Sequence, residues 1–377
     1  MIPFNRPFLA GKELFYISQA VLKGKLSGDG DFTHRCSRWL EEATGCRKAF
    51  LTHSCTAALE MTAILCGIEP GDEIIMPSFT FVSTANAFVL RGGVPVFVDI
   101  RPDTMNIDER LIEHAVTPKT KAIVCVHYAG VPCEMDEIMR IADKHGLFVI
   151  EDAAQALDSS WKGKPLGSIG HFGCLSFHET KNVISGEGGA LLVNDEAFIE
   201  RAEIIREKGT NRGKFFRGEI DRYTWVDIGS SYLPGELIAA FLFAQLEETA
   251  RINAKRRELC CSYFEAFRSI EDKGFVSLPV HSDTDAGNGH MFFLVTKSIS
   301  ERTDLIAFLK ARGVMAIFHY VPLHSSPAGL RFGRAEGTLK ITDRISSTLL
   351  RLPLYYEMTS EEQRQVIDGV LAFYKKA

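Results

Sequence analysis

The sequence lacks a long apolar segment. Its most apolar stretch with helical spacing, residues 237–246, is far shorter than the roughly 20 residues that a membrane-spanning helix needs. The N-terminus reads MIPFNRPFLAGKELF, without the charged start and apolar core of a signal peptide. We therefore expect a cytoplasmic protein that has no membrane partner.

Clusters of basic residues and cysteine pairs with the spacing of metal ligands are also missing. The formal net charge is −5, and no cluster of lysine and arginine forms the basic patch that nucleic-acid binding requires. None of the nine cysteines belongs to a C-x-x-C pair, which argues against both a zinc site and a disulfide framework. We expect no nucleic-acid partner, no bound metal and reduced thiols.

What is present is the composition of a soluble globular protein. The chain has 377 residues, of which 46% are apolar and 24% charged, enough for one large domain and a smaller one. From residue 46 onward, short apolar runs alternate with helical patterns, which predicts a mostly parallel sheet covered on both faces. Strands are predicted at 48–52, 73–77, 94–99, 121–126 and 147–152. Two further strands, at 174–178 and 189–194, are predicted to form a return pair, in which the chain runs out along one strand and back along the other.

The pattern changes after Pro234. Residues 235–267 predict one long helix, because their apolar side chains recur near helical spacing. Strands at 291–295 and 315–318 and helices at 302–312 and 361–375 are predicted beyond it. We expect a large domain over residues 1–234, with an N-terminal arm, and a smaller C-terminal α+β domain over 235–377.

Polar and aromatic residues follow several of the predicted strands, at the edge where parallel sheets bind ligands. Asp152 ends one strand, where it either forms a structural salt bridge or faces a cationic ring nitrogen. Cys55 and Thr56 open a helix after another, as an ordinary cap region or as an anion site. Phe81 follows a third, either as a core residue or stacked on a flat ring.

Lys181 lies between two strand-like runs and precedes the glycine-rich residues 185–189. It either belongs to a surface turn or supplies an amine that bonds covalently to a cofactor aldehyde. A phosphate cradle, a stacking aromatic ring, a carboxylate and a lysine are the four parts that a pyridoxal phosphate site needs. These strand-end residues supply all four parts, and the surface turn stays open as the alternative for Lys181.

A series of ordered segments carries a resemblance to a known family. They read PSFTFVSTANA (77–87), GGVPVFVDI (92–100), TMNID (104–108), VHYAGVPCEMD (126–136), IEDAAQALDS (150–159), SFHETKNVISGEGGALLVND (176–195) and HYVPLH (319–324). The chain resembles the DegT/DnrJ/EryC1/StrS sugar-nucleotide aminotransferases. This resemblance implies the α/β fold of the aspartate aminotransferase type (fold type I), pyridoxal 5'-phosphate as cofactor, and a homodimer.

The resemblance also implies a role for each matching residue. Lys181 is expected to hold the cofactor covalently and to move protons, and Asp152 to pair with the pyridine nitrogen. The other implied cofactor contacts are Gln155 near the ring hydroxyl, Ser176, Cys55 and Thr56 at the phosphate, and Phe81 on the ring face.

One segment departs from the family pattern. Where the family often has asparagine, tyrosine and a basic residue reaching the neighbouring subunit's phosphate, this chain reads GSSYL at 229–233. Leu233 stands at the cationic position. Ser231 keeps a hydroxyl that can donate to the phosphate.

Three segments resemble a narrower subgroup, which makes dTDP-4-amino-4,6-dideoxygalactose for enterobacterial common antigen. They are SFHETKN, DIGSSYLP (227–234) and MAIFHYVPLH (315–324). The resemblance implies dTDP-4-keto-6-deoxyglucose as substrate and L-glutamate as amino donor. His319, Tyr320 and His324 are candidates for sugar-nucleotide contacts, although such residues are often structural.

Other activities remain as alternatives. The GEGG sequence at 186–189 favours amination at C4, and an aminotransferase acting at C3, or giving an equatorial C4 amine, stays open. Related sugar dehydratases carry histidine in place of the lysine, so Lys181 argues against that reaction. A regulatory protein that binds the cofactor without catalysis would be expected to carry a DNA-reading domain, for which the chain has no basic patch.

Overall fold

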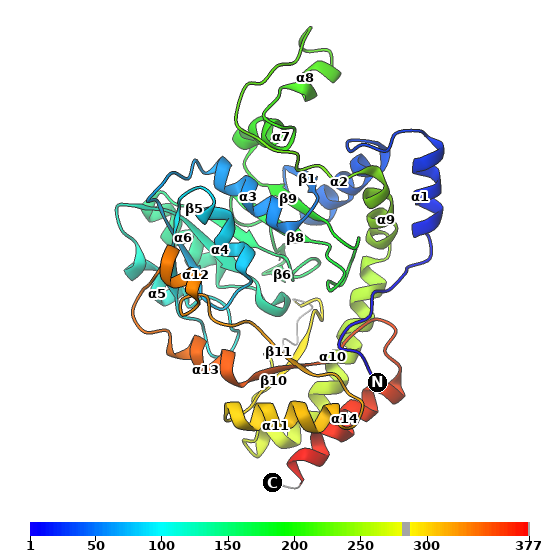
Figure 1. Ribbon diagram of the computed structural model, residues 1–377, viewed down its shortest axis with the longest axis vertical. Helices are drawn as coiled ribbons and strands as arrows, with labels where there is room; N and C mark the ends of the chain where they lie inside the picture. Colours follow the sequence, from blue (N-terminus) through cyan, green and yellow to red (C-terminus); the bar gives the residue numbers. More distant parts are fainter. Residues whose placement is uncertain (281–286, 376–377) are drawn as a thin grey trace.

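The computed structural model describes residues 1–280 and 287–375. Its centre is an eight-stranded sheet in the order β1-β9-β8-β5-β4-β2-β3-β12 (Figure 1). The strands are β1 (Lys48–Thr52), β2 (Glu73–Pro77), β3 (Val94–Val98), β4 (Thr120–Val126), β5 (Phe148–Asp152), β8 (Phe172–Ser176), β9 (Gly189–Val193) and β12 (Arg334–Ala335). Only β9 runs antiparallel to its neighbours, so the predicted α/β class and the return pair of strands are confirmed.

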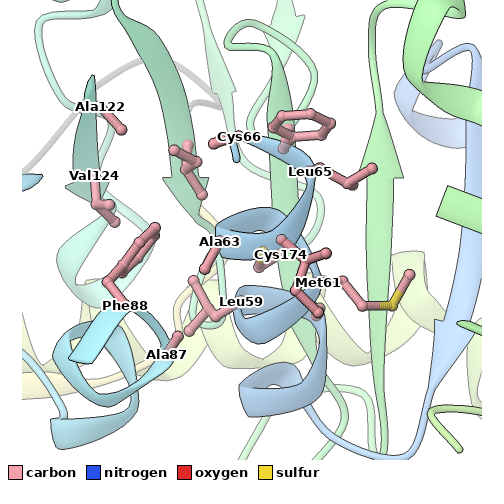
Figure 2. Close-up of a cluster of buried hydrophobic side chains, with 14 of the residues drawn as sticks. Leu59, Met61, Ala63, Leu65, Cys66, Ala87, Phe88, Ala122, Val124 and Cys174 are labelled. Carbon is pink, nitrogen blue, oxygen red and sulfur yellow. The ribbon is translucent and has the colours of Figure 1, made fainter. Parts of the chain in front are cut away.

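Helices cover both faces of this sheet, because alternate strand residues point to opposite sides. One face packs against α3 (Cys55–Leu65), α4 (Val82–Val89) and α7 (Ile199–Arg206). Figure 2 shows part of this layer, with Phe88 of α4 beside Val124 of the sheet and with Leu59 and Ala63 of α3 in the same cluster. The other face packs against α1 (Glu13–Leu22), α2 (Asp31–Thr44), α5 (Glu109–Ala115), α6 (Met135–His145) and α9 (Glu236–Leu246).

A second, antiparallel sheet has the order β10-β13-β11, formed by β10 (Phe292–Val295), β13 (Leu349–Leu352) and β11 (Ile317–Phe318). It packs on α10 (Thr249–Asp272), α11 (Ile299–Lys310) and α14 (Ser360–Tyr374). The remaining elements are β6 (Ser160–Trp161), β7 (Lys164–Pro165), α8 (Arg212–Phe216), α12 (Pro327–Phe332), α13 (Lys340–Thr348) and 3-10 turns at Tyr128–Gly130 and Glu196–Phe198. No helix among the described residues is long and apolar enough to cross a membrane.

The single long helix predicted over 235–267 is wrong. α9 ends at Leu246 and α10 begins at Thr249, with non-helical backbone at Glu248 (φ −108°, ψ 9°). α9 buries its apolar residues beside the large sheet, whereas α10 buries its apolar residues beside the small one, except for Ile252 near its start. No proline or glycine marks this break, so local sequence gave no signal for it.

The predicted division of the chain at residue 234 stays a prediction. α9 follows that position and packs in the core of the large sheet. β12, later still in the chain, pairs in parallel with β3 at the edge of the same sheet.

Candidate active site

A cavity of about 830 Å³ lies at the carboxyl ends of β5 and β8, beside the N-terminus of α3. Residues of the three-stranded sheet close its other side. Most of the residues predicted to bind cofactor or sugar line it: Lys181, Asp152, Gln155, Ser176, Cys55, Thr56, Phe81, His319 and Tyr320. The structure therefore brings together side chains from five separate segments of the sequence.

Lys181 follows β8 in a short turn, where its backbone N–H donates to the carbonyl of His178 at 2.9 Å. The side chain is half-buried and lines the cavity, in contrast to an ordinary surface-turn lysine. Burial lowers the pKa of its amine, and the positive charge of Arg351 lowers it further. Its Nζ forms no ion pair with any carboxylate of the described residues, which leaves the amine available for reaction.

Asp152 is buried at the end of β5. Thr84 Oγ1 donates to its Oδ2 at 2.7 Å, and the backbone N–H of Ala154 donates to Oδ1 at 3.2 Å. Within the described residues no basic side chain forms a salt bridge with it, so the structural ion pair is not formed. Burial raises the pKa of this carboxyl group. A carboxylate in this position fits a cationic ring nitrogen, which would supply the missing charge.

The N-terminus of α3 forms a cradle that fits a phosphate group. Ser54 caps the helix by accepting from Ala57 N–H at 3.0 Å, while Cys55 and Thr56 follow at the first two helical positions. The first N–H groups of a helix have no partner within it, and they attract anions. Gly189 allows the close approach of β9, because an added Cβ would collide with the backbone nitrogen of Cys55.

Phe81 and Gln155 border the rest of the cavity. The ring of Phe81 is 57% exposed and lies outside the apolar core, whereas Phe79 two residues earlier is buried. Gln155 accepts from the backbone N–H of Ala129 at 2.6 Å and donates through Nε2 to Tyr320 Oη at 2.9 Å. A flat ring placed between Asp152 and α3 would thus meet an aromatic face and an amide.

Of the three residues predicted to contact the sugar, two line the cavity and the third does not. His319 and Tyr320 line the cavity and stack with ring centroids 3.6 Å apart, and His319 Nδ1 lies 2.7 Å from Tyr128 Oη. His324 is not among the lining residues, and its Nδ1 lies 2.7 Å from Ser78 Oγ. Ser231 is exposed and pairs with Glu207 outside the cavity. The roles of these residues stay predictions.

Sequence reasoning missed several residues that line or support the cavity. Ser83 lies 2.7 Å from the hydroxyl of Thr56, and Thr84 holds Asp152. Arg256, His290 and Arg351 enter from the C-terminal part of the chain. Arg351 had a usable signal, since it is a lone cation inside the apolar run LLRLPL (349–354).

Comparisons with known proteins agree with this geometry. Residues 9–371 match the DegT/DnrJ/EryC1/StrS aminotransferase family. The chain is 33% identical over 390 aligned residues to the spore coat polysaccharide biosynthesis protein SpsC of Bacillus subtilis, covering 100% of this chain and 98% of SpsC. It superposes on the aminotransferase TlmJ of Streptoalloteichus hindustanus with a TM-score of 0.91 and 28% identity, covering 100% and 99% of the two chains.

A third relative shows the cofactor. The putative sugar aminotransferase Spr1654 of Streptococcus pneumoniae, solved in its PMP form, has a TM-score of 0.91 and 26% identity, with 100% of each chain covered. The cavity described above offers a lysine, a carboxylate, an aromatic face and an anion cradle that fit the same cofactor. The chain belongs to the DegT/DnrJ/EryC1/StrS aminotransferase family and is a pyridoxal-phosphate-dependent aminotransferase.

Proposed function

We propose that this enzyme transfers the amino group of L-glutamate to C4 of dTDP-4-keto-6-deoxyglucose. The products are 2-oxoglutarate and dTDP-4-amino-4,6-dideoxygalactose. The observation that carries the transamination is the presence in one cavity of Lys181 and the buried carboxylate Asp152, neither of which forms an ion pair within the described residues. The choice of sugar rests on the resemblance of segments 176–182, 227–234 and 315–324 to the subgroup that makes this product.

The proposed cofactor contacts follow from the cavity wall. Asp152 would hold the ring nitrogen in its protonated state, and Phe81 would stack on the ring. Gln155 would contact the ring hydroxyl, and Ser176 and the first N–H groups of α3 would hold the phosphate. When bound, pyridoxal phosphate acts as an electron sink for the electrons released as the donor's α-proton leaves.

Lys181 moves the protons. A protonated amine cannot act as a base, and burial lowers the pKa of Lys181, which favours its neutral form. Its Nζ takes the proton from the donor's α-carbon in the first half of the reaction. In the second half it returns a proton to C4 of the sugar, on the face that leaves the amine axial. General acid–base catalysis by a positioned side chain contributes about 10²–10⁴-fold to the reaction rate.

His319 and Tyr320 are proposed to contact the sugar. Both lie on the cavity wall contributed by the segment that follows β11. Nδ1 of His319 is engaged with Tyr128, so its other ring nitrogen is the one proposed to meet a sugar hydroxyl. The cavity volume of about 830 Å³ falls within the range of small-molecule sites.

The assembly is proposed to be a homodimer in which Ser231 reaches the partner's phosphate. Figure 1 shows α8 projecting from the body of the molecule beyond α7. The segment around it exposes large apolar side chains, including Phe216 at 67% and Trp225 at 78%. Exposed apolar surface of this kind marks interaction sites. The product is proposed to enter surface polysaccharide synthesis such as that of enterobacterial common antigen, which agrees with the name of the relative SpsC.

The test is an end-point assay of purified protein with pyridoxal phosphate, L-glutamate and dTDP-4-keto-6-deoxyglucose, with the product read by NMR. The proposal predicts an axial amine at C4. An equatorial C4 amine or a C3 amine would keep the transaminase chemistry and overturn the sugar assignment. No sugar product from an enzyme that still reacts with glutamate would mean a different keto sugar.

A further inference from the structure

Asn182, the residue that follows Lys181, belongs to a chain of buried polar side chains that the proposed mechanism does not use. Its Nδ2 donates to Oδ1 of Asn253 in α10 at 2.8 Å and to the backbone carbonyl of Asn288 at 2.9 Å. Its Oδ1 lies 2.9 Å from Nδ1 of His290. The residue beside Lys181 is therefore held by three contacts from the C-terminal part of the chain.

The hydrogen bonds in this chain can run in only one direction. Asn253 donates through Nδ2 to the carboxylate of Asp158 at 3.0 Å, so its Oδ1 is the atom that accepts from Asn182. The backbone carbonyl of Asn288 can also only accept. The amide of Asn182 thus has its nitrogen fixed as a double donor, and its Oδ1 is the acceptor that faces His290.

His290 must therefore carry its ring proton on Nδ1. Its Nε2 keeps a lone pair and forms no hydrogen bond within the part of the chain that the structure describes. Burial lowers the pKa of His290, and nearby basic groups lower it further: Lys181, Arg256, Arg351 and His319. The ring is consequently neutral near pH 7, and it lines the same cavity as Lys181.

The turn that carries Lys181 needs such anchors. Among the described residues, the backbone of Lys181 makes one hydrogen bond, from its N–H to the carbonyl of His178. In the proposed mechanism the amine of Lys181 moves protons, which requires reacting atoms about 3–3.5 Å apart. A displacement of about 1 Å can lower a reaction rate about 100-fold. The contacts of Asn182 restrict such displacement.

We propose that His290 is a positioning residue, which holds Lys181 in its reactive place by donating Nδ1–H to Asn182. In this assignment His290 acts through Asn182 and contacts neither the amino donor nor the sugar. The inference rests on the proposed function for the role of Lys181 as the proton carrier. Because His290 lies just before β10, it makes the place of Lys181 depend on the position of the small sheet.

Three substitutions of His290 separate the two ring nitrogens. His290→Asn keeps a donor near the place of Nδ1, His290→Gln keeps a polar group near the place of Nε2, and His290→Leu keeps neither. The reaction with L-glutamate is followed by stopped-flow absorbance of the bound cofactor, without any sugar. In His290→Leu and His290→Gln, the rate constant at saturating glutamate should fall about 10- to 100-fold, with an unchanged dissociation constant. His290→Asn should recover most of the rate.

A double variant tests whether His290 acts through Asn182. Asn182→Leu should lower the same rate constant, because it removes the acceptor of the His290 proton. Adding His290→Leu to that variant should cause little further loss, since the two substitutions remove one shared contact. Additive losses would show that His290 acts independently of Asn182 and would overturn the proposal.

The tautomer can be measured without any turnover. In ¹⁵N NMR of the resting enzyme labelled at histidine, the ring signals that disappear in His290→Asn identify His290. The proposal predicts a neutral ring with its proton on Nδ1. A proton on Nε2, or a doubly protonated ring at neutral pH, would contradict it. This measurement holds even where a variant fails to fold.

His171→Leu is the matched control. His171 is half-buried, its Nδ1 accepts from the backbone N–H of Val149 at 3.0 Å, and it is not among the cavity-lining residues. This variant should react with glutamate like the unaltered enzyme. The melting temperature of each variant shows whether its fold is intact.

Two kinetic results would overturn the assignment. Recovery by His290→Gln in place of His290→Asn, or weaker glutamate binding with an unchanged rate constant, would mean that Nε2 contacts the donor. An equal loss in all three His290 variants would make His290 a structural residue. If the unaltered enzyme forms no bond between Lys181 and the cofactor, the proposed function fails, whatever the tautomer of His290. A different sugar product in the NMR assay leaves the His290 assignment standing.

Discussion

Thr84 Oγ1 donates a 2.7 Å hydrogen bond to Oδ2 of Asp152, and Thr84 is itself fully buried in α4. The bond orients the carboxylate that is proposed to hold the cofactor's ring nitrogen. Thr80 Oγ1 lies 2.8 Å from the same threonine hydroxyl and completes a short chain of polar groups. The helix after β2 thereby positions the carboxylate at the end of β5.

Removing this hydroxyl should weaken cofactor binding. Thr84→Val leaves Asp152 with one fewer donor, and a hydrogen bond to a charged group contributes about 1.5–3 kcal/mol. The dissociation constant for pyridoxal phosphate should rise at least about tenfold, measured by fluorescence titration. Asp152→Asn should weaken cofactor binding more than Thr84→Val does, because it removes the negative charge of the carboxylate. Thr62→Val is the matched control, since Thr62 is buried and its hydroxyl donates to the carbonyl of Leu59 in its own helix; an equal effect there would count against the account.

Glu151, beside Asp152 in β5, should be important for stability. Its buried carboxylate accepts from the backbone N–H groups of Gly167, Ile169 and Gly170 at 2.6–2.7 Å, and lies 2.9 Å from His127 Nε2. Glu151→Ala would leave all four groups without an acceptor and should cost about 3–5 kcal/mol of unfolding free energy. Urea denaturation measures this cost. Glu258→Ala, at an exposed position, is the control. A decrease in unfolding free energy below about 1 kcal/mol for Glu151→Ala would disprove the role of Glu151 in stability.

Gly189 is predicted to be irreplaceable at the phosphate cradle. An alanine Cβ there would collide with the backbone of Ser54 and Cys55, pushing α3 away from β9. Gly189→Ala should therefore lower both the melting temperature and the affinity for pyridoxal phosphate. Gly287→Ala is the control, because an added Cβ there meets no atom within 4 Å. Unchanged cofactor affinity in Gly189→Ala would place the phosphate elsewhere.

The lowered pKa of Lys181 predicts a pH dependence of stability in the cofactor-free protein. The pKa of the folded state lies below the unfolded value of 10.5, so protonated Lys181 destabilises the fold. Stability should rise with pH between those two values, as the folded state releases the proton first. Lys181→Met should melt at a higher temperature than the unaltered protein near neutral pH, and the difference should shrink toward about pH 10. A constant difference across this range would contradict the pKa shift.

Much of the fold and the core of the site could be predicted from local patterns. The strands of the large sheet are short apolar runs and Asp152 ends one of them, so periodicity located both. The assignment of Lys181 to the cofactor came from the resemblance of ordered segments to a known family. Three features depend on contacts between distant residues. The break before Thr249 reflects two separate cores, the pairing of β12 with β3 joins residues far apart in sequence, and Arg351 reaches the cavity only because β13 lies between β10 and β11.

The central claim is that Lys181 bonds covalently to pyridoxal phosphate. Borohydride reduction of the protein with its cofactor, followed by proteolysis and mass spectrometry, locates the bond directly. We predict a phosphopyridoxyl mass on the peptide that contains Lys181, and its absence after prior treatment with L-glutamate. The same mass on a peptide with a different lysine, or no labelled peptide from an enzyme saturated with cofactor, would contradict the account.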